Sequence, residues 1–322
     1  MIIVTGAAGF IGSRLIKRLN EDNFKNIVAV DKFGDPQKER NLEGLDIHLR
    51  VNREDFIDWL DQQNEEVEFI FHIGAKTDTT LFDKALLKEL NTDYTRDVWV
   101  RCVGYHIRLV YASSAATYGL GEYGYKDDED LLPKLQPLNP YGQSKQDFDV
   151  WALEQEEQPF FWAGLKFFNV YGPHEDHKGR MASVIWHAFH QISETGKMKL
   201  FRSHNPEYKD GEQMRDFVYV QDVVDVCVWL MHHRKNSGIY NLGSGKARTF
   251  KDLVSAVFAA MENEEKIEFI DTPEDIRDKY QYFTEATMEK LRQAGYAKEF
   301  HTLEEGVSDY VRNYLVPMKQ NA

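Results

Sequence analysis

A tyrosine and a lysine in the stretch NPYGQSK have the types and the spacing of a catalytic base. Tyr141 and Lys145 are four residues apart, which places both side chains on one face of a helix. Asn139 and Pro140 before them are residue types that begin helices. A phenol has a pKa of about 10 and is a poor base at neutral pH, but an ammonium alongside it favours the phenolate. The pattern predicts a general base, although the same spacing by itself is usually only a helix face.

A pair of hydroxyl side chains stands upstream, in the stretch YASSAATYG. These serines follow a β-branched and aromatic run that is typical of a strand. We expect Ser114 to form a hydrogen bond with the hydroxyl oxygen of a substrate alcohol. Ser113 has the alternative role of a strand-end cap.

A glycine-rich turn opens the chain in IIVTGAAGFIG. Gly6, Gly9 and Gly12 follow one apolar run and precede a helical pattern, and Asp31 ends the next apolar run. Glycines at these positions allow a tight turn and a close approach of the backbone to a pyrophosphate, and an acid about 20 residues on binds the adenine-side ribose. The arrangement predicts a dinucleotide site and therefore a hydride carrier for the tyrosine and lysine.

The segment DKFGDPQKER bears on which dinucleotide binds. Asp31 alone favours NAD, because a carboxylate repels a 2′-phosphate. Lys32, Lys38 and Arg40 follow it and supply cations that neutralise such a phosphate. A solvated basic loop is the alternative, but we predict NADP.

Short apolar runs alternate with helical patterns up to about residue 170. This alternation predicts βαβ units in a doubly wound parallel sheet of the Rossmann type. After FNVYGP the pattern changes to helices separated by short strands. We expect an α/β protein with a dinucleotide-binding domain over 1–170, to which later segments return, and a smaller, mostly helical, partly interleaved substrate domain over 171–322.

Composition excludes several classes of protein. The formal net charge is −14, and the electrostatic field of such a chain repels nucleic acid and anionic membranes.

Cys102 and Cys227 lie in apolar segments, which indicates buried thiols and not a disulfide. His174 and His177 lack a carboxylate or cysteine at ligand spacing, so we predict no metal. No run is long and apolar enough to span a membrane, and we expect a cytoplasmic protein.

The glycine spacing, the strand-end SSAATYG and the tyrosine–lysine pair together resemble the extended short-chain dehydrogenase/reductase family, which acts largely on nucleotide sugars. FNVYGP, HKGRMASV, LFRS, MRDFVYVQDV and IYNLGSGKARTF are similar to the members that epimerise C6″ of an ADP-activated heptose with NADP, in lipopolysaccharide inner-core synthesis. The resemblance covers nearly the whole chain and implies a homo-oligomer, a pentamer.

The resemblance implies three sets of site residues. The catalytic residues would be Ser114, Tyr141, Lys145 and Lys178. The NADP site would comprise Gly6, Gly9, Phe10, Ile11, Gly12, Asp31, Lys32, Lys38, Arg53, His72, Ile73, Gly74, Ala75, Lys76, Asn91, Lys145, Val170 and Lys178. The ADP-heptose would contact Asn169, Arg180, His187, Phe201, Arg202, Arg215 and Tyr280. Lys32, Arg53 and Arg180 are not the residues of every member.

The resemblance implies that Lys178 is a second catalytic acid/base, although a lone lysine is more often a surface residue. Epimerisation through a transient ketone requires hydride to leave one face of the carbon and return to the other. After the ketone turns over, its oxygen no longer faces Tyr141, so a second acid/base is needed, and burial would lower a lysine's pKa for that task.

A dehydratase of the family is the alternative enzyme, but Ala115 and Ala116 stand where it would carry its Asp–Glu pair. A cofactor-binding regulator would typically lack Tyr141 or Lys145.

Overall fold

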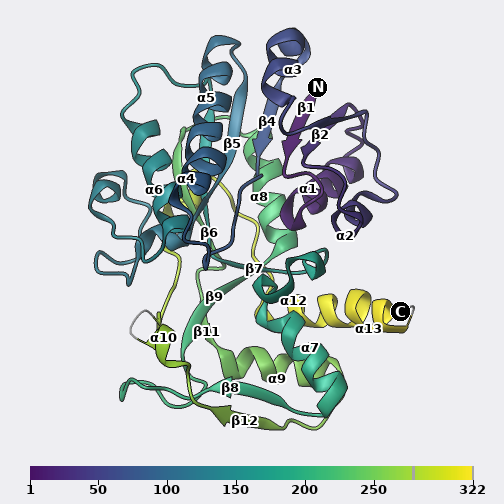
Figure 1. Cartoon of the computed structure of the whole chain (residues 1–322), viewed down its shortest axis with the longest axis vertical. Coiled ribbons are helices and arrows are strands. Elements are labelled where there is room, and N and C mark those ends of the chain that lie inside the picture. Colours follow the sequence, from purple (N-terminus) through teal and green to yellow (C-terminus); the bar gives the residue numbers. More distant parts are fainter. Residues whose placement is uncertain (278–279, 321–322) are drawn as a thin grey trace. The chain divides into compact units, whose positions relative to one another are not determined.

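The computed structural model describes residues 1–277 and 280–320 and divides the chain into two units. The first unit comprises Met1–Phe167, Val223–Leu242 and Glu289–Ala297. The second comprises Phe168–Asp222, Gly243–Met288 and Lys298–Ala322. The expected boundary at residue 170 falls three residues after the first break, and two later segments return to the first unit (Figure 1).

A seven-stranded parallel sheet forms the centre of the first unit, with the strand order β10-β6-β5-β4-β1-β2-β3. Helices flank it, as Figure 1 shows. Most strands are buried along their whole length, as expected for a parallel sheet covered on both faces. The predicted doubly wound fold is confirmed. In chain order the strands are β1 (Ile2–Thr5), β2 (Ile27–Asp31), β3 (Leu49–Asn52), β4 (Phe69–His72), β5 (Arg108–Ser114), β6 (Trp162–Phe167) and β10 (Gly238–Leu242).

The helices of the first unit connect these strands. Helix α6 (Pro140–Leu153) begins as predicted, because the Asn139 side chain accepts a hydrogen bond from the Gly142 amide and Pro140 occupies the first turn. The helix after β4 is one continuous segment in which α4 (Lys84–Leu87), a π-helical turn and α5 (Tyr94–Gly104) follow one another. The remaining helices include α1 (Phe10–Glu21), α2 (Pro36–Glu39), α3 (Phe56–Gln63), α8 (Val220–His232) and α11 (Glu289–Gln293).

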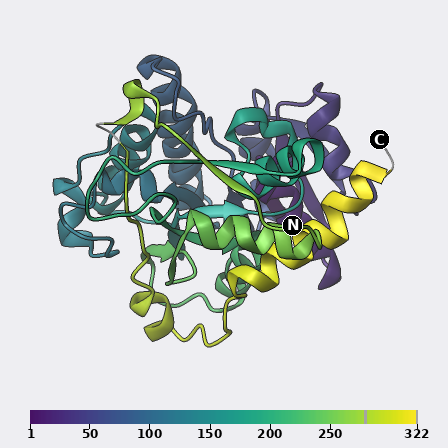
Figure 2. The ribbon, with the colours of Figure 1, turned by 90° about the horizontal axis from the view of Figure 1, so that it is seen from below.

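The second unit contains two small sheets as well as helices. Its three-stranded sheet has the order β11-β9-β7 and its two-stranded sheet pairs β12 with β8. Helices α9 (Phe250–Ala260) and α12 (Leu303–Tyr310) pack against each other, and Figure 2 shows them as neighbouring green and yellow ribbons. The other elements are β7 (Asn169–Tyr171), α7 (Val184–Thr195), β8 (Met198–Phe201), β9 (Met214–Tyr219), β11 (Ala247–Thr249), β12 (Ile267–Ile270), α10 (Glu274–Arg277) and α13 (Val316–Gln320).

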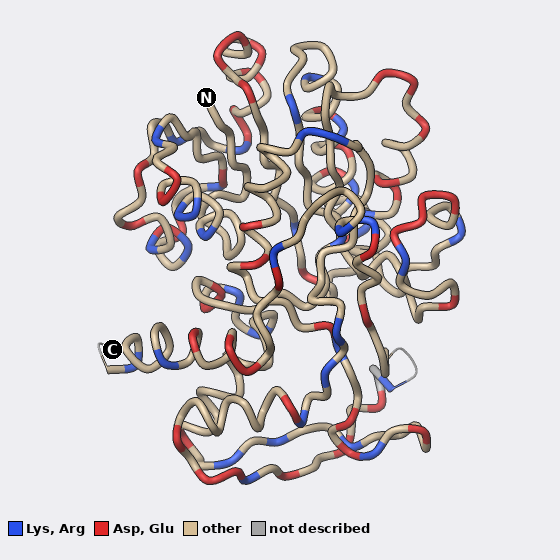
Figure 3. Tube along the Cα trace, turned by 180° about the vertical axis from the view of Figure 1, so that it is seen from behind, with Lys and Arg blue, Asp and Glu red and all other residues tan. Residues whose placement is uncertain are grey.

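Charged residues of both signs are interspersed along both units in Figure 3. Within the described residues, no helix combines the length and the apolar character needed to cross a bilayer. The two cysteines, Cys102 and Cys227, are both buried free thiols. The expected thiol state of these residues is therefore confirmed.

Candidate active site

The glycine-rich turn between β1 and α1 leaves no room for a side chain at Gly6 or Gly12. Gly6 has φ +65°, and a Cβ on it would lie 2.6 Å from the Cα of Gly74. A Cβ on Gly12 would lie 2.1 Å from the Gly6 carbonyl oxygen. Such close backbone packing at the mouth of a helix is what a dinucleotide pyrophosphate requires, because the amides and the helix N-terminus then face the phosphates. The residues present therefore fit a dinucleotide.

The carboxylate of Asp31 is held at the end of β2 by three donors. Its Oδ2 accepts from the Ala8 amide at 2.9 Å, and its Oδ1 accepts from the Lys32 amide at 2.8 Å. The Lys38 ammonium also binds Oδ1, at 2.6 Å. The sequence predicted that Lys38 binds the 2′-phosphate of NADP. In this structure Lys38 instead pairs with Asp31, and this lessens the repulsion that the carboxylate would exert on such a phosphate.

The predicted turn after β4 is tied to both β1 and α5. The buried His72 ring hydrogen-bonds Thr5 Oγ1 at 2.8 Å and Thr95 Oγ1 at 3.1 Å. Burial, with a smaller contribution from the charge of Lys145, lowers the pKa of His72 to about 3, so this imidazole is neutral. The side chain of His72 faces the interior, and the main chain of the turn continues from it past Gly74 to Lys76.

Asn91 connects this turn to helix α6. Its side chain accepts a hydrogen bond from the Lys76 amide at 2.8 Å and donates to the Lys76 carbonyl at 3.0 Å. It also donates to Ser144 Oγ at 3.0 Å, and Ser144 in turn donates to the Tyr141 carbonyl at 2.7 Å. The position of Asn91 is therefore fixed relative to both the turn and the start of α6. Arg53, another predicted cofactor residue, donates its amide to the Asp31 carbonyl at 2.9 Å.

Tyr141, Ser114 and Lys145 come together at the end of β5. Burial raises the pKa of the Tyr141 phenol, and a hydrogen bond with Ser114 opposes this effect only in part. The sequence predicted that Lys145 would pull this pKa down. Lys145 instead donates to the Ala112 carbonyl at 2.8 Å, and burial lowers its own pKa to about 8. In the protein alone, the tyrosine therefore holds its proton more firmly than expected.

Two buried charged residues beside this group were missed by the sequence reasoning. Asp149 and Lys166 form an ion pair at 2.7 Å with no exposed side-chain surface, and Ser113 donates to Asp149 at 2.6 Å. Ser113 is thus a partner of Asp149 and not a strand-end cap. The available signal was the four-residue spacing of Tyr141, Lys145 and Asp149 together with a single lysine in an otherwise apolar strand.

Lys178 lies in the second unit, in a short helical turn over Asp176–Met181. The side chain is partly buried, and loss of hydration lowers the pKa of Lys178, although the charge of Glu175 opposes this effect. Glu175 is fully buried and accepts from the amide and the hydroxyl of Ser183 at 2.6 and 2.7 Å. Glu175, which the sequence reasoning also missed, therefore anchors the turn that carries Lys178.

Three of the predicted substrate residues form one cluster in the second unit. The Arg215 guanidinium lies 5.5 Å from the centroid of the Tyr280 ring and 5.6 Å from that of Phe250. The rings of Phe201 and Tyr280 meet edge to face at 6.5 Å. Arg215 also donates to the Met214 carbonyl at 2.8 Å. The cluster presents a cation and aromatic faces, the chemistry that binds a nucleoside diphosphate.

The other predicted residues of the second unit lie on or beside several elements. His187 on α7 lies 3.4 Å from the Arg180 carbonyl through its Nε2. Asn169 is exposed, and Val170 beside it pairs with Val218 in the three-stranded sheet. Arg202 is also exposed and follows Phe201. These five residues therefore come from several elements of the unit.

Comparison with known proteins identifies the family of the chain. The model of the NAD dependent epimerase/dehydratase family matches residues 2–243. The chain is 48% identical to a protein of Fusobacterium nucleatum named ADP-L-glycero-D-manno-heptose-6-epimerase, over 98% of each chain. The crystal structure of the Helicobacter pylori protein of that name is similar, with a TM-score of 0.81 and 28% identity over 97% of this chain and 95% of that one. MoeE5 in complex with UDP-glucuronic acid and NAD has a TM-score of 0.76 and 25% identity, over 97% and 99% of the two chains.

Proposed function

The chain belongs to the NAD dependent epimerase/dehydratase family, and we propose that it converts ADP-D-glycero-D-manno-heptose to its L-glycero epimer at C6″. The observation that carries this proposal is the 48% identity, over 98% of each chain, to a relative named for that reaction. Identity over nearly the full length includes the second unit, which carries the proposed substrate residues. The reaction makes a precursor of the lipopolysaccharide inner core.

The cofactor of the proposed reaction is NADP. A nicotinamide cofactor is supported by the family and by the glycine turn. The preference for the phosphorylated form is supported by the Lys38–Asp31 ion pair, since a neutralised Asp31 no longer repels a 2′-phosphate. When bound, the nicotinamide accepts a hydride from C6″ and later returns it.

Tyr141 is the proposed acid/base for one epimer. Ser114 already hydrogen-bonds the phenol and would hold the C6″ oxygen in line with it. The phenolate takes the hydroxyl proton as the hydride leaves C6″, and the phenol returns a proton when this epimer is re-formed. Lys145, buried beside them and bonded to Ala112, keeps a positive charge near the phenolate at neutral pH.

Lys178 is the proposed acid/base for the other epimer. The ketone presents its opposite face to the fixed cofactor after turning over, so its oxygen needs a second proton donor. An ammonium with a lowered pKa is a good donor, and the amine it leaves is a good base for the reverse direction. Glu175 would hold the turn of Lys178 in place through Ser183.

The second unit is proposed to select the ADP-heptose. Arg215, Tyr280 and Phe201 would bind the ADP portion, because a guanidinium suits a diphosphate and aromatic faces suit a base. Further contacts are proposed for Asn169, Arg180, His187 and Arg202. We also propose a cytoplasmic homo-oligomer, a pentamer by family resemblance, which light scattering on the purified protein would test.

A dehydratase on the same fold is the alternative enzyme. Elimination of water needs an acid and a base next to the ketone, and Ala115 and Ala116 offer neither. A non-catalytic NADP-binding regulator is the other alternative. It would not require Tyr141 and Ser114 to be joined by a hydrogen bond at the end of β5.

The direct test is incubation of the purified holoenzyme with ADP-D-glycero-D-manno-heptose, followed by NMR of the product at C6″. The proposal expects the L-glycero epimer with no change in mass. A product lighter by one water would indicate a dehydratase. Tight NADP binding without any product would favour the regulator. Tyr141→Phe is the control, because it removes the proposed base and retains the shape of the side chain.

A further inference from the structure

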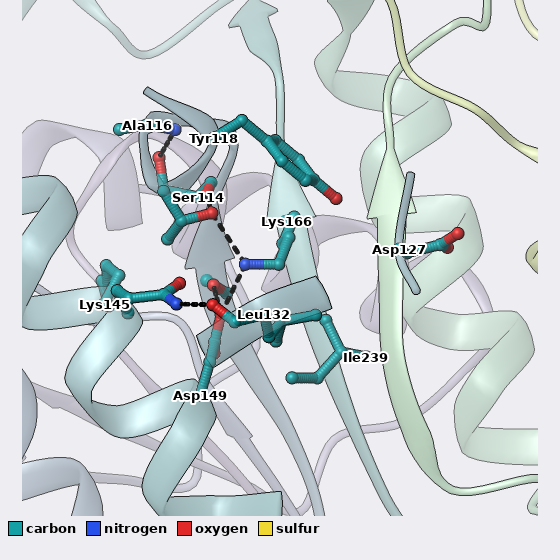
Figure 4. A network of polar contacts seen from close by, with 12 residues as sticks. Ser114, Ala116, Tyr118, Asp127, Leu132, Lys145, Asp149, Lys166 and Ile239 are labelled. Carbon is teal, nitrogen blue, oxygen red and sulfur yellow. Dashed lines mark hydrogen bonds and ion pairs between the residues drawn. The ribbon is translucent and has the colours of Figure 1, made fainter. Parts of the chain in front are cut away.

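The Asp149–Lys166 ion pair lies wholly inside the first unit. The Lys166 ammonium binds Asp149 Oδ2 and Thr117 Oγ1, each at 2.7 Å, and lies 5.2 Å from the centroid of the Tyr118 ring. Neither side chain of the pair has any exposed surface. Figure 4 shows Lys166 between Asp149 and Tyr118, with Ser114 nearby.

Stability of the fold is a weak explanation for this pair. Removing two charges from water carries a large desolvation cost, and apolar residues of the same shape often stabilise a protein equally well or better. Asp149 is nonetheless fully provided with partners, because Tyr111 OH donates to it at 3.0 Å and Ser113 at 2.6 Å, in addition to Lys166. A network so completely satisfied fixes the positions of its members.

The network is continuous with the catalytic group. Tyr141, Lys145 and Asp149 follow one another at intervals of four residues along α6, so one helix face carries all three. Thr117, which accepts from Lys166, donates to the Ser114 carbonyl at 2.9 Å. The residues of β5 therefore alternate between the catalytic group and the ion pair: Ala112 receives Lys145, Ser113 binds Asp149 and Ser114 binds Tyr141.

We propose that Asp149 and Lys166 are positioning residues of the reaction, which hold the end of β5 against α6 so that Ser114, Tyr141 and Lys145 stay aligned. This inference rests on the proposed function for the roles of those three residues. The pair itself touches neither substrate nor cofactor in the proposal. It acts through Ser113, Thr117 and the shared face of α6.

The charge of Asp149 also acts on the group it positions. It opposes the effect of burial on Lys145 and so keeps the pKa of that ammonium from falling further, and it raises the pKa of Tyr141. His72 on β4 interacts electrostatically with Lys145, and Tyr111 on β5 and Lys166 on β6 bind Asp149. His72 is neutral, and burial raises the pKa of Tyr111, so that phenol is neutral too. Asp149 is thus the anion that sustains the charge of Lys145.

The test compares the wild-type protein with Asp149→Leu/Lys166→Met, in which both charges are replaced by apolar side chains of similar shape. The proposal expects an unfolding midpoint near that of the wild type but a kcat lower by about 10- to 100-fold, because displacement of reacting groups by even 1 Å has effects of that order. In Asp149→Asn, which removes the anion alone, both limbs of the pH profile of kcat should move to lower pH, since the charge of Asp149 raises the pKa of Lys145 and of Tyr141. Lys166→Arg, which keeps the cation, should retain most of the activity.

A readout without turnover separates this inference from the proposed function. NMR of ε-¹³C-labelled lysines, with Lys145 assigned by Lys145→Met, gives the pKa of that ammonium directly. Asp149→Asn, which keeps the side chain's shape and serves if the double variant does not fold, should lower that pKa below the wild-type value of about 8. If wild-type protein fails to epimerise ADP-heptose while this shift is present, the proposed function fails and the link between Asp149 and Lys145 stands.

A second ion pair of the first unit provides the matched control. Lys290 and Glu129 lie 2.6 Å apart, and Glu129 accepts from the Ile239 amide on β10, at the edge of the sheet. Glu129→Leu/Lys290→Met should leave the pKa of Lys145 and the pH profile unchanged. If Asp149→Asn also leaves both unchanged, or if the Asp149/Lys166 double variant has wild-type kcat, the pair only fills the core and the proposal is wrong.

Discussion

Removing the charge of Lys38 should shift cofactor preference from NADP toward NAD. In Lys38→Met, the Asp31 carboxylate loses the ammonium that lies 2.6 Å from its Oδ1 but keeps the Ala8 and Lys32 amides. Asp31 then repels a 2′-phosphate and has an oxygen to accept a ribose hydroxyl. A charge-assisted hydrogen bond contributes about 1.5–3 kcal/mol, so the ratio of NADP to NAD affinity should fall by about 10- to 150-fold.

Isothermal titration of both cofactors into the protein freed of nucleotide measures this ratio. Lys25→Met is the matched control, because Lys25 also pairs with an aspartate, Asp46 at 3.2 Å, but lies on the exposed surface. The control should leave the ratio unchanged. An unchanged ratio in Lys38→Met would remove Lys38 from the cofactor site and with it the main support for NADP.

Three further results are expected. Gly12→Ala should abolish tight dinucleotide binding in a fluorescence titration, because its Cβ would lie 2.1 Å from the Gly6 oxygen; near wild-type affinity would show that the close packing of this turn is not needed for binding. Ser114→Ala removes a hydrogen bond that lowers the pKa of Tyr141, so the acidic limb of the kcat profile, where the base becomes protonated, should move to higher pH. In D2O the epimerised product should retain hydrogen at C6″ by mass spectrometry, since hydride stays on the cofactor; substantial deuterium there would exclude the ketone route.

Much of the first unit was predictable because its signals are local. The glycine turn and the buried apolar strands each stand within a few residues, and their alternation with helices determines a parallel sheet. Strand β3 was not predicted, because in LRVN only Val51 is buried and the edge position leaves the other three residues exposed. Strand β10 joins β6 from far along the chain, a pairing that no local pattern specifies.

The site was predictable where a motif fixes the spacing and not where a partner comes from another element. Tyr141 and Ser114 lie together, whereas Lys145 binds the Ala112 carbonyl of the same strand and does not lower the pKa of Tyr141 as expected. The contact of Lys38 with Asp31, the burial of Asp149 with Lys166 and the support of Lys178 by Glu175 depend on tertiary packing. Whether a buried lysine or carboxylate is charged follows from its desolvation and its neighbours, and neither can be read from one stretch of sequence.

The central claim is that Tyr141 and Lys178 serve opposite epimers, and single-turnover reduction of bound NADP tests it most directly. Each purified holoenzyme, Tyr141→Phe and Lys178→Met, is mixed separately with the D-glycero and the L-glycero substrate, and the initial burst of reduced-nicotinamide fluorescence is followed. Each variant should lose the burst with one epimer by about 10²- to 10⁴-fold, the range for a positioned acid or base, and the two variants should lose it with opposite epimers. If both variants fail with the same epimer, or if Lys178→Met turns over normally, the two-base account is wrong.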